Sequence, residues 1–81
     1  MYYVYVIKSL KDGKLYVGHT NNLIERLRRH NQGFEKATKN RKPFKVIYYE
    51  ASNFIEDAVK REKSLKRGFG RAYLKRRLKD I

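Results

Sequence analysis

The chain has 81 residues, enough for one small domain, and it contains no cysteine, so neither disulfides nor thiolate-bound metals can stabilise it. No apolar run reaches the roughly 18 residues of a membrane-spanning helix, so we expect a cytoplasmic protein without membrane contacts. The 21 Lys and Arg residues outnumber the 8 Asp and Glu residues, and the net charge of +13 predicts a polyanionic partner, above all nucleic acid.

The first part of the chain favours a β-hairpin. Residues 2–8 alternate in polarity and are rich in Tyr, Val and Ile, which is typical of a strand and argues against a signal peptide. Asp12-Gly13 is a strong turn signal, and residues 15–18 would form the second strand.

The middle of the chain predicts a helix, a loop and a third strand. Asn22 with Glu25 forms a capping-box pattern that opens a helix, and Gly33 would end it. Residues 34–43 are polar and basic, so we expect a mobile basic loop. Residues 44–49 are apolar and aromatic, as expected of a strand.

The last third predicts two helices. Asn53 with Glu56 forms a second capping-box pattern that opens a helix over 54–67. Two glycines would break this helix, and a short basic helix over 71–79 would follow. The order β-β-α-β-α-α predicts one α/β (α+β) domain, with a three-stranded, mostly antiparallel sheet flanked by helices.

Charged side chains interrupt the apolar faces of both long helices. Arg26 and His30 share one face of the first helix with Leu23 and Leu27, at spacings of three and four residues. Glu62 lies within the apolar stripe of the second helix. A carboxylate there must be paired, protonated or bound to a metal. Either Glu62 forms an internal ion pair with Arg26 that only fixes the packing, or these polar groups line a functional cleft.

An ordered set of residues carries a family resemblance. Tyr3-Val4-Tyr5 is followed after ten residues by Tyr16-Val17-Gly18, and Arg26 comes ten residues after Tyr16. With His30 and Glu62, the pattern resembles the GIY-YIG nuclease superfamily, and within it the small stand-alone bacterial proteins of the YhbQ-like type. The resemblance covers nearly the whole chain and implies an endonuclease that hydrolyses DNA or RNA backbones with one Mg²⁺ or Mn²⁺ ion.

The resemblance also implies roles for single residues. Glu62 would hold the metal, and one carboxylate can suffice because Mg²⁺ keeps most of its waters. Arg26 would bind the scissile phosphate through its planar paired donors. The general base would be Tyr5 or Tyr16, while His30 or His19 could instead act as the base or orient the water.

Phosphate contacts are expected from the basic segments and from Gly18, where the missing side chain would let a phosphate approach the backbone. The predicted nucleic-acid-binding residues are Gly18, Lys36, Lys39, Arg41, Lys42, Lys66, Arg67, Arg71, Lys75 and Arg76. DNA is favoured over RNA as the partner. We expect no attached targeting domain, so specificity would come from an unknown protein partner or from substrate shape, or it would be absent.

Three departures from the family pattern leave the activity open. Tyr3 replaces the glycine of the first tripeptide, His19 stands where some members have lysine, and no Asn follows Asn53. One alternative is a non-catalytic module of the same fold that binds nucleic acid. Another is a basic accessory protein of the ribosome or of a membrane surface.

Overall fold

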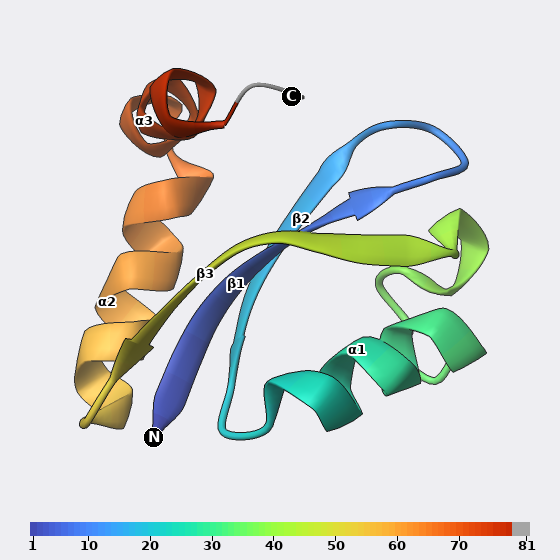
Figure 1. Cartoon of the computed structure of the whole chain (residues 1–81), viewed down its shortest axis with the longest axis horizontal. Helices are drawn as coiled ribbons and strands as arrows, with labels where there is room; N and C mark the ends of the chain where they lie inside the picture. Colours follow the sequence, from blue (N-terminus) through green and yellow to red (C-terminus); the bar gives the residue numbers. More distant parts are fainter. Residues whose placement is uncertain (79–81) are drawn as a thin grey trace.

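The computed structural model describes residues 1–78 of the chain. Within this part, strands β1 (Tyr2–Ser9), β2 (Leu15–Thr20) and β3 (Phe44–Ser52) form one antiparallel sheet in the order β2-β1-β3. The helices are α1 (Leu23–Gln32), α2 (Ile55–Lys66) and α3 (Gly68–Arg77), and a short 3-10 turn spans Lys39–Arg41. The predicted α+β fold and its element order are therefore confirmed (Figure 1).

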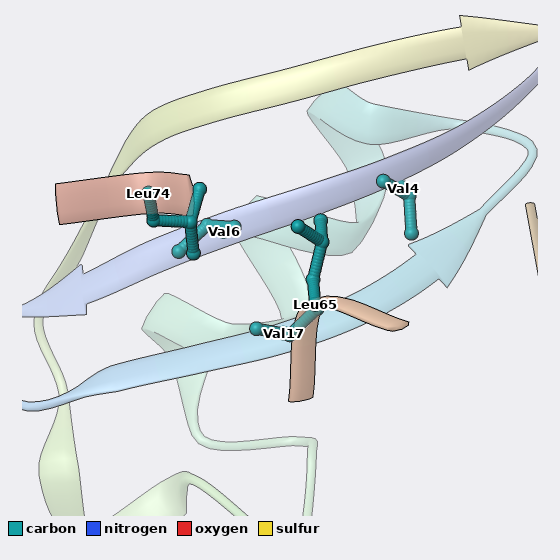
Figure 2. Close-up of a cluster of buried hydrophobic side chains, with 5 residues drawn as sticks. All are labelled: Val4, Val6, Val17, Leu65 and Leu74. Carbon is teal, nitrogen blue, oxygen red and sulfur yellow. The ribbon is translucent and has the colours of Figure 1, made fainter. Parts of the chain in front are cut away.

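The central strand β1 supplies side chains to both faces of the sheet, because successive residues of a strand point to opposite sides. Val4 and Val6 pack with Val17 of β2 and with Leu65 and Leu74 of the C-terminal helices (Figure 2). Helices α2 and α3 thus cover one face of the twisted sheet, and α1 lies on the other side (Figure 1).

The α1 face of the sheet has a smaller, more polar core. Tyr5 and Ile7 of β1 pack there with Phe44 at the start of β3, and Leu23 and Leu27 of α1 cover them. The first helix therefore buries the predicted face against the sheet.

The two outer strands are longer than predicted because β1 pairs with them over almost its whole length. Tyr3 pairs with Thr20 at the end of β2, and Tyr2 pairs with Ser52 at the end of β3. The predicted turn is confirmed, since Gly13 has a φ of 72° and its N–H donates to the Ser9 carbonyl oxygen.

The ends of α1 follow the sequence signals. The Asn22 side chain accepts a hydrogen bond from the Glu25 N–H at 3.1 Å, and Gly33 ends the helix with a φ of 79°. The Glu25 carboxylate, however, contacts Arg28 on the same helix, so only the Asn22 half of the capping box forms as predicted.

The second predicted capping box is wrong. Helix α2 begins at Ile55 with Phe54 as its N-cap, and no side chain caps it. The helix thus starts one residue too late for Asn53 to be its N-cap.

The glycines near residue 70 begin a helix instead of separating two. Helix α3 starts at Gly68, three residues before the predicted start, and the break between α2 and α3 lies at Arg67. A side chain at Gly70 would overlap the Leu65 Cα atom and the Ser64 carbonyl oxygen, so this glycine permits the close approach of α3 to α2. The predicted end of this helix at Lys79 lies outside the described residues.

The basic segment between α1 and β3 is anchored to the fold. Thr38 is fully buried, and the Ser9 hydroxyl donates to the Arg41 carbonyl oxygen at 2.6 Å. The segment therefore has fixed points that its polar sequence did not indicate. No helix within residues 1–78 combines the length and apolar character that crossing a bilayer requires.

Candidate active site

A buried polar cluster lies between the sheet and α1. The Tyr5 hydroxyl is 2.8 Å from His30 Nε2, and the other ring nitrogen of His30 is 2.7 Å from the Thr38 hydroxyl. Tyr5 and His30 are each 1% exposed. Since both partners of the imidazole are hydroxyls, either neutral tautomer is satisfied. His30, on the sheet-facing side of α1, and the strand tyrosine thus belong to one hydrogen-bonded network.

Gly18 makes room for this network. It pairs with Tyr5 across the β1–β2 ladder. A Cβ atom at position 18 would lie 2.6 Å from the Tyr5 hydroxyl and 2.8 Å from the carbon that bears it. The glycine is therefore needed where it stands because a tyrosine ring fills the space of its missing side chain.

Burial holds the groups of this network in their neutral forms. Desolvation raises the pKa of the Tyr5 hydroxyl well above its ordinary value, although the nearby positive charge of Arg26 opposes the shift. Burial likewise lowers the pKa of His30 below its ordinary value. At neutral pH, therefore, Tyr5 is a phenol and His30 is an uncharged imidazole.

Tyr16 is more accessible than Tyr5. Its ring lies beside His30, with 5.2 Å between the ring centroids, and it is only partly buried. Tyr16 also lines the large open groove that is described below. The two tyrosines of the motif therefore share one histidine neighbour, and of the pair Tyr16 is the one that faces solvent.

Arg26 is held at this cluster by a carboxylate that the sequence analysis missed. Its Nε atom lies 3.9 Å from a carboxylate oxygen of Glu35, and the same oxygen accepts a 2.8 Å hydrogen bond from Arg29. The hydrogen bond from Arg29 is the main reason that the pKa of Glu35 is lowered. Glu35 is the single acidic residue of the basic 34–43 segment. This isolated carboxylate was the sequence signal that could have indicated a partner for the arginines of α1.

Glu62 does not pair with Arg26. Its carboxylate accepts from His19 Nδ1 at 2.5 Å and from Lys66 Nζ at 2.7 Å, and the side chain is 17% exposed. Burial is the largest single influence and acts to raise its pKa, but the hydrogen bonds and electrostatic attraction from Lys66 and His19 together outweigh burial, and the pKa is lowered. The internal Glu62–Arg26 ion pair considered above is therefore wrong.

The predicted site residues form two groups that meet at β2. Tyr5, Tyr16, Arg26 and His30 gather on the α1 face, whereas His19 and Glu62 pair on the α2 face. The groups touch neighbouring residues of one strand, because Gly18 belongs to the first and His19 to the second. Since β2 is an edge strand, the two groups lie on opposite faces of the sheet at its edge.

The residues around Glu62 could bind a metal ion only with few protein ligands. Within residues 1–78 no three His, Asp or Glu side chains gather into a cation site. Glu62 could act as a single carboxylate ligand, which suits Mg²⁺ when substrate phosphate oxygens and water supply the other ligands. Lys66 now occupies one of its oxygens and would have to give way.

An open groove of about 1000 Å³ lies between the β1–β2 hairpin and α3. Four of the predicted nucleic-acid-binding residues line it, namely Arg41, Lys66, Arg71 and Lys75, together with two lysines that the sequence analysis missed, Lys8 and Lys14. The other predicted binding residues, Gly18, Lys36, Lys39, Lys42, Arg67 and Arg76, are not among its lining residues.

Comparison with known proteins identifies the family of this chain. A sequence model described as the GIY-YIG catalytic domain matches residues 1–79. The chain belongs to the GIY-YIG family. This family is one of nucleases, and both tyrosines, Arg26 and Glu62 lie within the matched residues.

Small bacterial members of the family are similar over most of their length. A UPF0213 protein of Clostridium perfringens is 43% identical over 83% of this GIY-YIG chain and 72% of its own length. UPF0213 proteins of Staphylococcus saprophyticus and Pediococcus pentosaceus are 38% and 42% identical, each over 80% of this chain and over 79% and 68% of their own lengths. No solved structure matches significantly.

Proposed function

We propose that this GIY-YIG protein is a metal-dependent endonuclease that hydrolyses nucleic acid backbones, DNA in preference to RNA. The observation that carries the proposal is the meeting of two polar groups at the edge strand β2: Tyr5, Tyr16, Arg26 and His30 on one face, Glu62 with His19 on the other. In this proposal, the guanidinium of Arg26, the phenol of Tyr16 and the carboxylate of Glu62 act on one phosphodiester bound at this edge of the sheet.

Arg26 is the proposed phosphate ligand. Its side chain is 36% exposed, so its guanidinium can contact a substrate, while Glu35 restrains its Nε end. A planar guanidinium offers paired donors to two oxygens of one phosphate, and it stabilises the charge that develops there.

Tyr16 is the proposed general base, in preference to Tyr5. Both lie beside His30, but Tyr5 is 1% exposed and its raised pKa opposes loss of its proton. A base must contact the water that it activates, and this requires the accessible phenol. The proposed roles of Tyr5 and His30 are to position Tyr16, because their shared hydrogen bond fixes the packing around it.

Glu62 is the proposed metal ligand, and His19 orients it through the 2.5 Å hydrogen bond to its carboxylate. A divalent cation bound there would supply charge stabilisation at the phosphate and assistance to the leaving oxygen. Every other ligand of such a cation would come from substrate and water.

The test is a cleavage panel of DNA and RNA structures with Mg²⁺ or Mn²⁺, run on the parent, the Glu62→Gln variant and a Glu56→Gln control. Glu56 is an exposed carboxylate on the same helix, so its replacement makes the same chemical change away from the site. We expect Glu62→Gln to lose cleavage and to keep its fold, while Glu56→Gln retains parental activity. Normal cleavage by Glu62→Gln would reject the metal role.

A second candidate function is a binding module of the same fold that does not cleave. The observation in its favour is the cationic groove, which needs no Glu62 charge to bind a polyanion. The Arg26→Lys variant separates the two candidates, because lysine keeps the charge but loses the planar fork. The nuclease predicts near-parental binding with much slower cleavage, whereas the module predicts no cleavage by either protein on any substrate.

A further inference from the structure

The groove between the β1–β2 hairpin and α3 is strongly cationic. Six of its lining residues carry positive charge, and Asp12 is its one carboxylate. Asp12 is already paired, since its carboxylate accepts from Arg41 Nε at 3.1 Å. The cationic lining residues are Lys8, Lys14, Arg41, Lys66, Arg71 and Lys75.

The walls of the groove strengthen the field of these charges. Buried apolar residues, namely Val17, Leu65 and Leu74, form part of the groove lining between the charged side chains. A concave surface of one sign of charge over a low-dielectric wall concentrates counter-ions more strongly than a flat surface does. The groove is therefore a region of the described surface where several side chains would hold a chain of phosphates at once.

Lys66 connects this groove to the proposed metal ligand. Its side chain is half exposed and lines the groove, while its Nζ atom donates to Glu62 at 2.7 Å. The ammonium group thus sits where a cation bound to that carboxylate oxygen would lie. A metal ion and Lys66 compete for the same oxygen.

We propose that the phosphate backbone of the nucleic acid lies in this groove, and that it takes Lys66 away from Glu62 so that the carboxylate can bind a divalent cation. The first claim, that the backbone binds in the groove, depends only on the lining residues. The second claim, that binding removes Lys66 from Glu62 and so couples DNA binding to metal binding, rests on the proposed function, because it requires Glu62 to be a metal ligand.

The exchange is physically reasonable because the Lys66 side chain can move. It is half exposed, long and flexible, so another anion can draw it away from Glu62. A phosphate in the groove offers Lys66 another anion, and Glu62 keeps its hydrogen bond from His19. Without nucleic acid, the lysine protects the carboxylate from adventitious cations.

Thermodynamic reciprocity makes the coupling measurable from both sides. If bound nucleic acid tightens metal binding by some factor, bound metal must tighten nucleic acid binding by the same factor. Typical couplings between two sites are about 5-fold to 150-fold. Neither measurement depends on cleavage.

The groove is tested by fluorescence anisotropy with a short labelled DNA in EDTA. A Lys14→Ser/Lys75→Ser double variant removes two groove charges, and a Lys60→Ser/Lys63→Ser control removes two exposed charges from α2. We expect the groove variant to bind about tenfold or more weakly, with a salt slope reduced by about 2, and the control to stay within about twofold. Equal losses from both pairs would overturn the groove, because net charge alone would then set the affinity.

The coupling is tested by Mn²⁺ titration, followed by electron paramagnetic resonance of the free ion, with and without an uncleavable phosphorothioate DNA. We expect the DNA to tighten Mn²⁺ binding at least about 5-fold, beyond the Mn²⁺ that the DNA binds alone. The Lys66→Met variant should bind Mn²⁺ more tightly without DNA and show little further gain with it. The Lys60→Met control should behave like the parent.

The outcomes distinguish failure of the coupling from failure of the proposed function. If the Lys66→Met variant and the parent bind Mn²⁺ equally tightly without DNA, the coupling is overturned, but Glu62 can still be a metal ligand. Loss of Mn²⁺ binding in Glu62→Gln supports the ligand role on which the coupling depends. Equal Mn²⁺ binding by Glu62→Gln and the parent would reject that role and the coupling together, whatever the groove variants show.

Discussion

At the scale of single residues, the two motif tyrosines occupy different environments. Tyr5 is buried against His30 and beneath Gly18, whereas Tyr16 is only partly buried. The sequence motif makes them look equivalent, but their different burial is the reason that different roles are proposed for them. Burial matters because a phenol without access to water cannot exchange protons with a bound substrate.

We predict opposite effects from removing each phenol oxygen. Tyr5→Phe should leave His30 Nε2 without its partner and reduce the free energy of unfolding by about 1–3 kcal/mol. Tyr16→Phe should slow cleavage by about 10²–10⁴ and barely change stability. Urea unfolding and initial rates at saturating substrate measure both. A large loss of rate with normal stability in Tyr5→Phe would instead make Tyr5 the base.

His30 should give the fold a pH dependence just below neutrality. Because its pKa is lowered on folding, the unfolded chain binds a proton below about pH 6.5 that the folded protein does not. Stability is therefore lost as pH falls from about 6.5, by at most about 1.4 kcal/mol per pH unit. Glu35, Glu50 and Glu62 have lowered pKa values, so their contributions are lost only below about pH 4.5.

Urea unfolding at several pH values between 7 and 5 checks this prediction. The parent should lose stability steadily over this range, and a His30→Gln variant should show a flatter dependence even if it is less stable throughout. An unchanged slope in His30→Gln would assign the effect to another group.

At the scale of elements, the junction of α2 and α3 depends on one glycine. Gly70 lies against the backbone of α2, whereas a Cβ atom at Gly68, in the same first turn of α3, would meet nothing within 4 Å. The two positions form a matched pair, since the same substitution tests close packing at one and helix propensity at the other.

Gly70→Ala should lower the free energy of unfolding by about 1–3 kcal/mol or more, because the rigid backbone of α2 cannot move aside cheaply. Gly68→Ala should leave stability unchanged or raise it by up to about 1 kcal/mol. Thermal unfolding measures both, at roughly 4–8 °C per kcal/mol for a domain of this size. Since α3 carries Arg71 and Lys75, Gly70→Ala should also weaken nucleic acid binding. Similar melting temperatures for the two variants would refute the packing role.

At the scale of the whole molecule, the net charge of +13 should dominate binding. Each neutralised phosphate releases counter-ions, so affinity falls steeply as salt rises. With on the order of five phosphate contacts, an increase from 50 to 200 mM salt should weaken binding by about 10²–10³. Anisotropy titrations with labelled DNA measure the slope, and a binding constant indifferent to salt would remove nucleic acid as the main partner.

The sequence by itself determined the elements and the family. Alternating polarity predicted β1, helical spacing predicted the buried face of α1, and Asn22 and Gly33 marked its ends, because these signals act between residues a few positions apart. The motif spacing likewise identified Arg26, Glu62 and both tyrosines as the residues of interest. Sequence signals failed where a longer-range contact prevailed, as at Gly70, whose glycine serves packing against α2 and does not mark a break.

Only the tertiary structure decided which side chains meet. In the folded protein Glu62 is hydrogen-bonded to His19 and Lys66, and Arg26 forms an ion pair with Glu35. It also brought hairpin and α3 lysines into one groove. These contacts join residues distant in sequence, and their side chains carry no local pattern that names a partner. The packing of three helices around the described sheet decides which phenol is buried and which carboxylate contacts two arginines. It also decides where the positive charge concentrates.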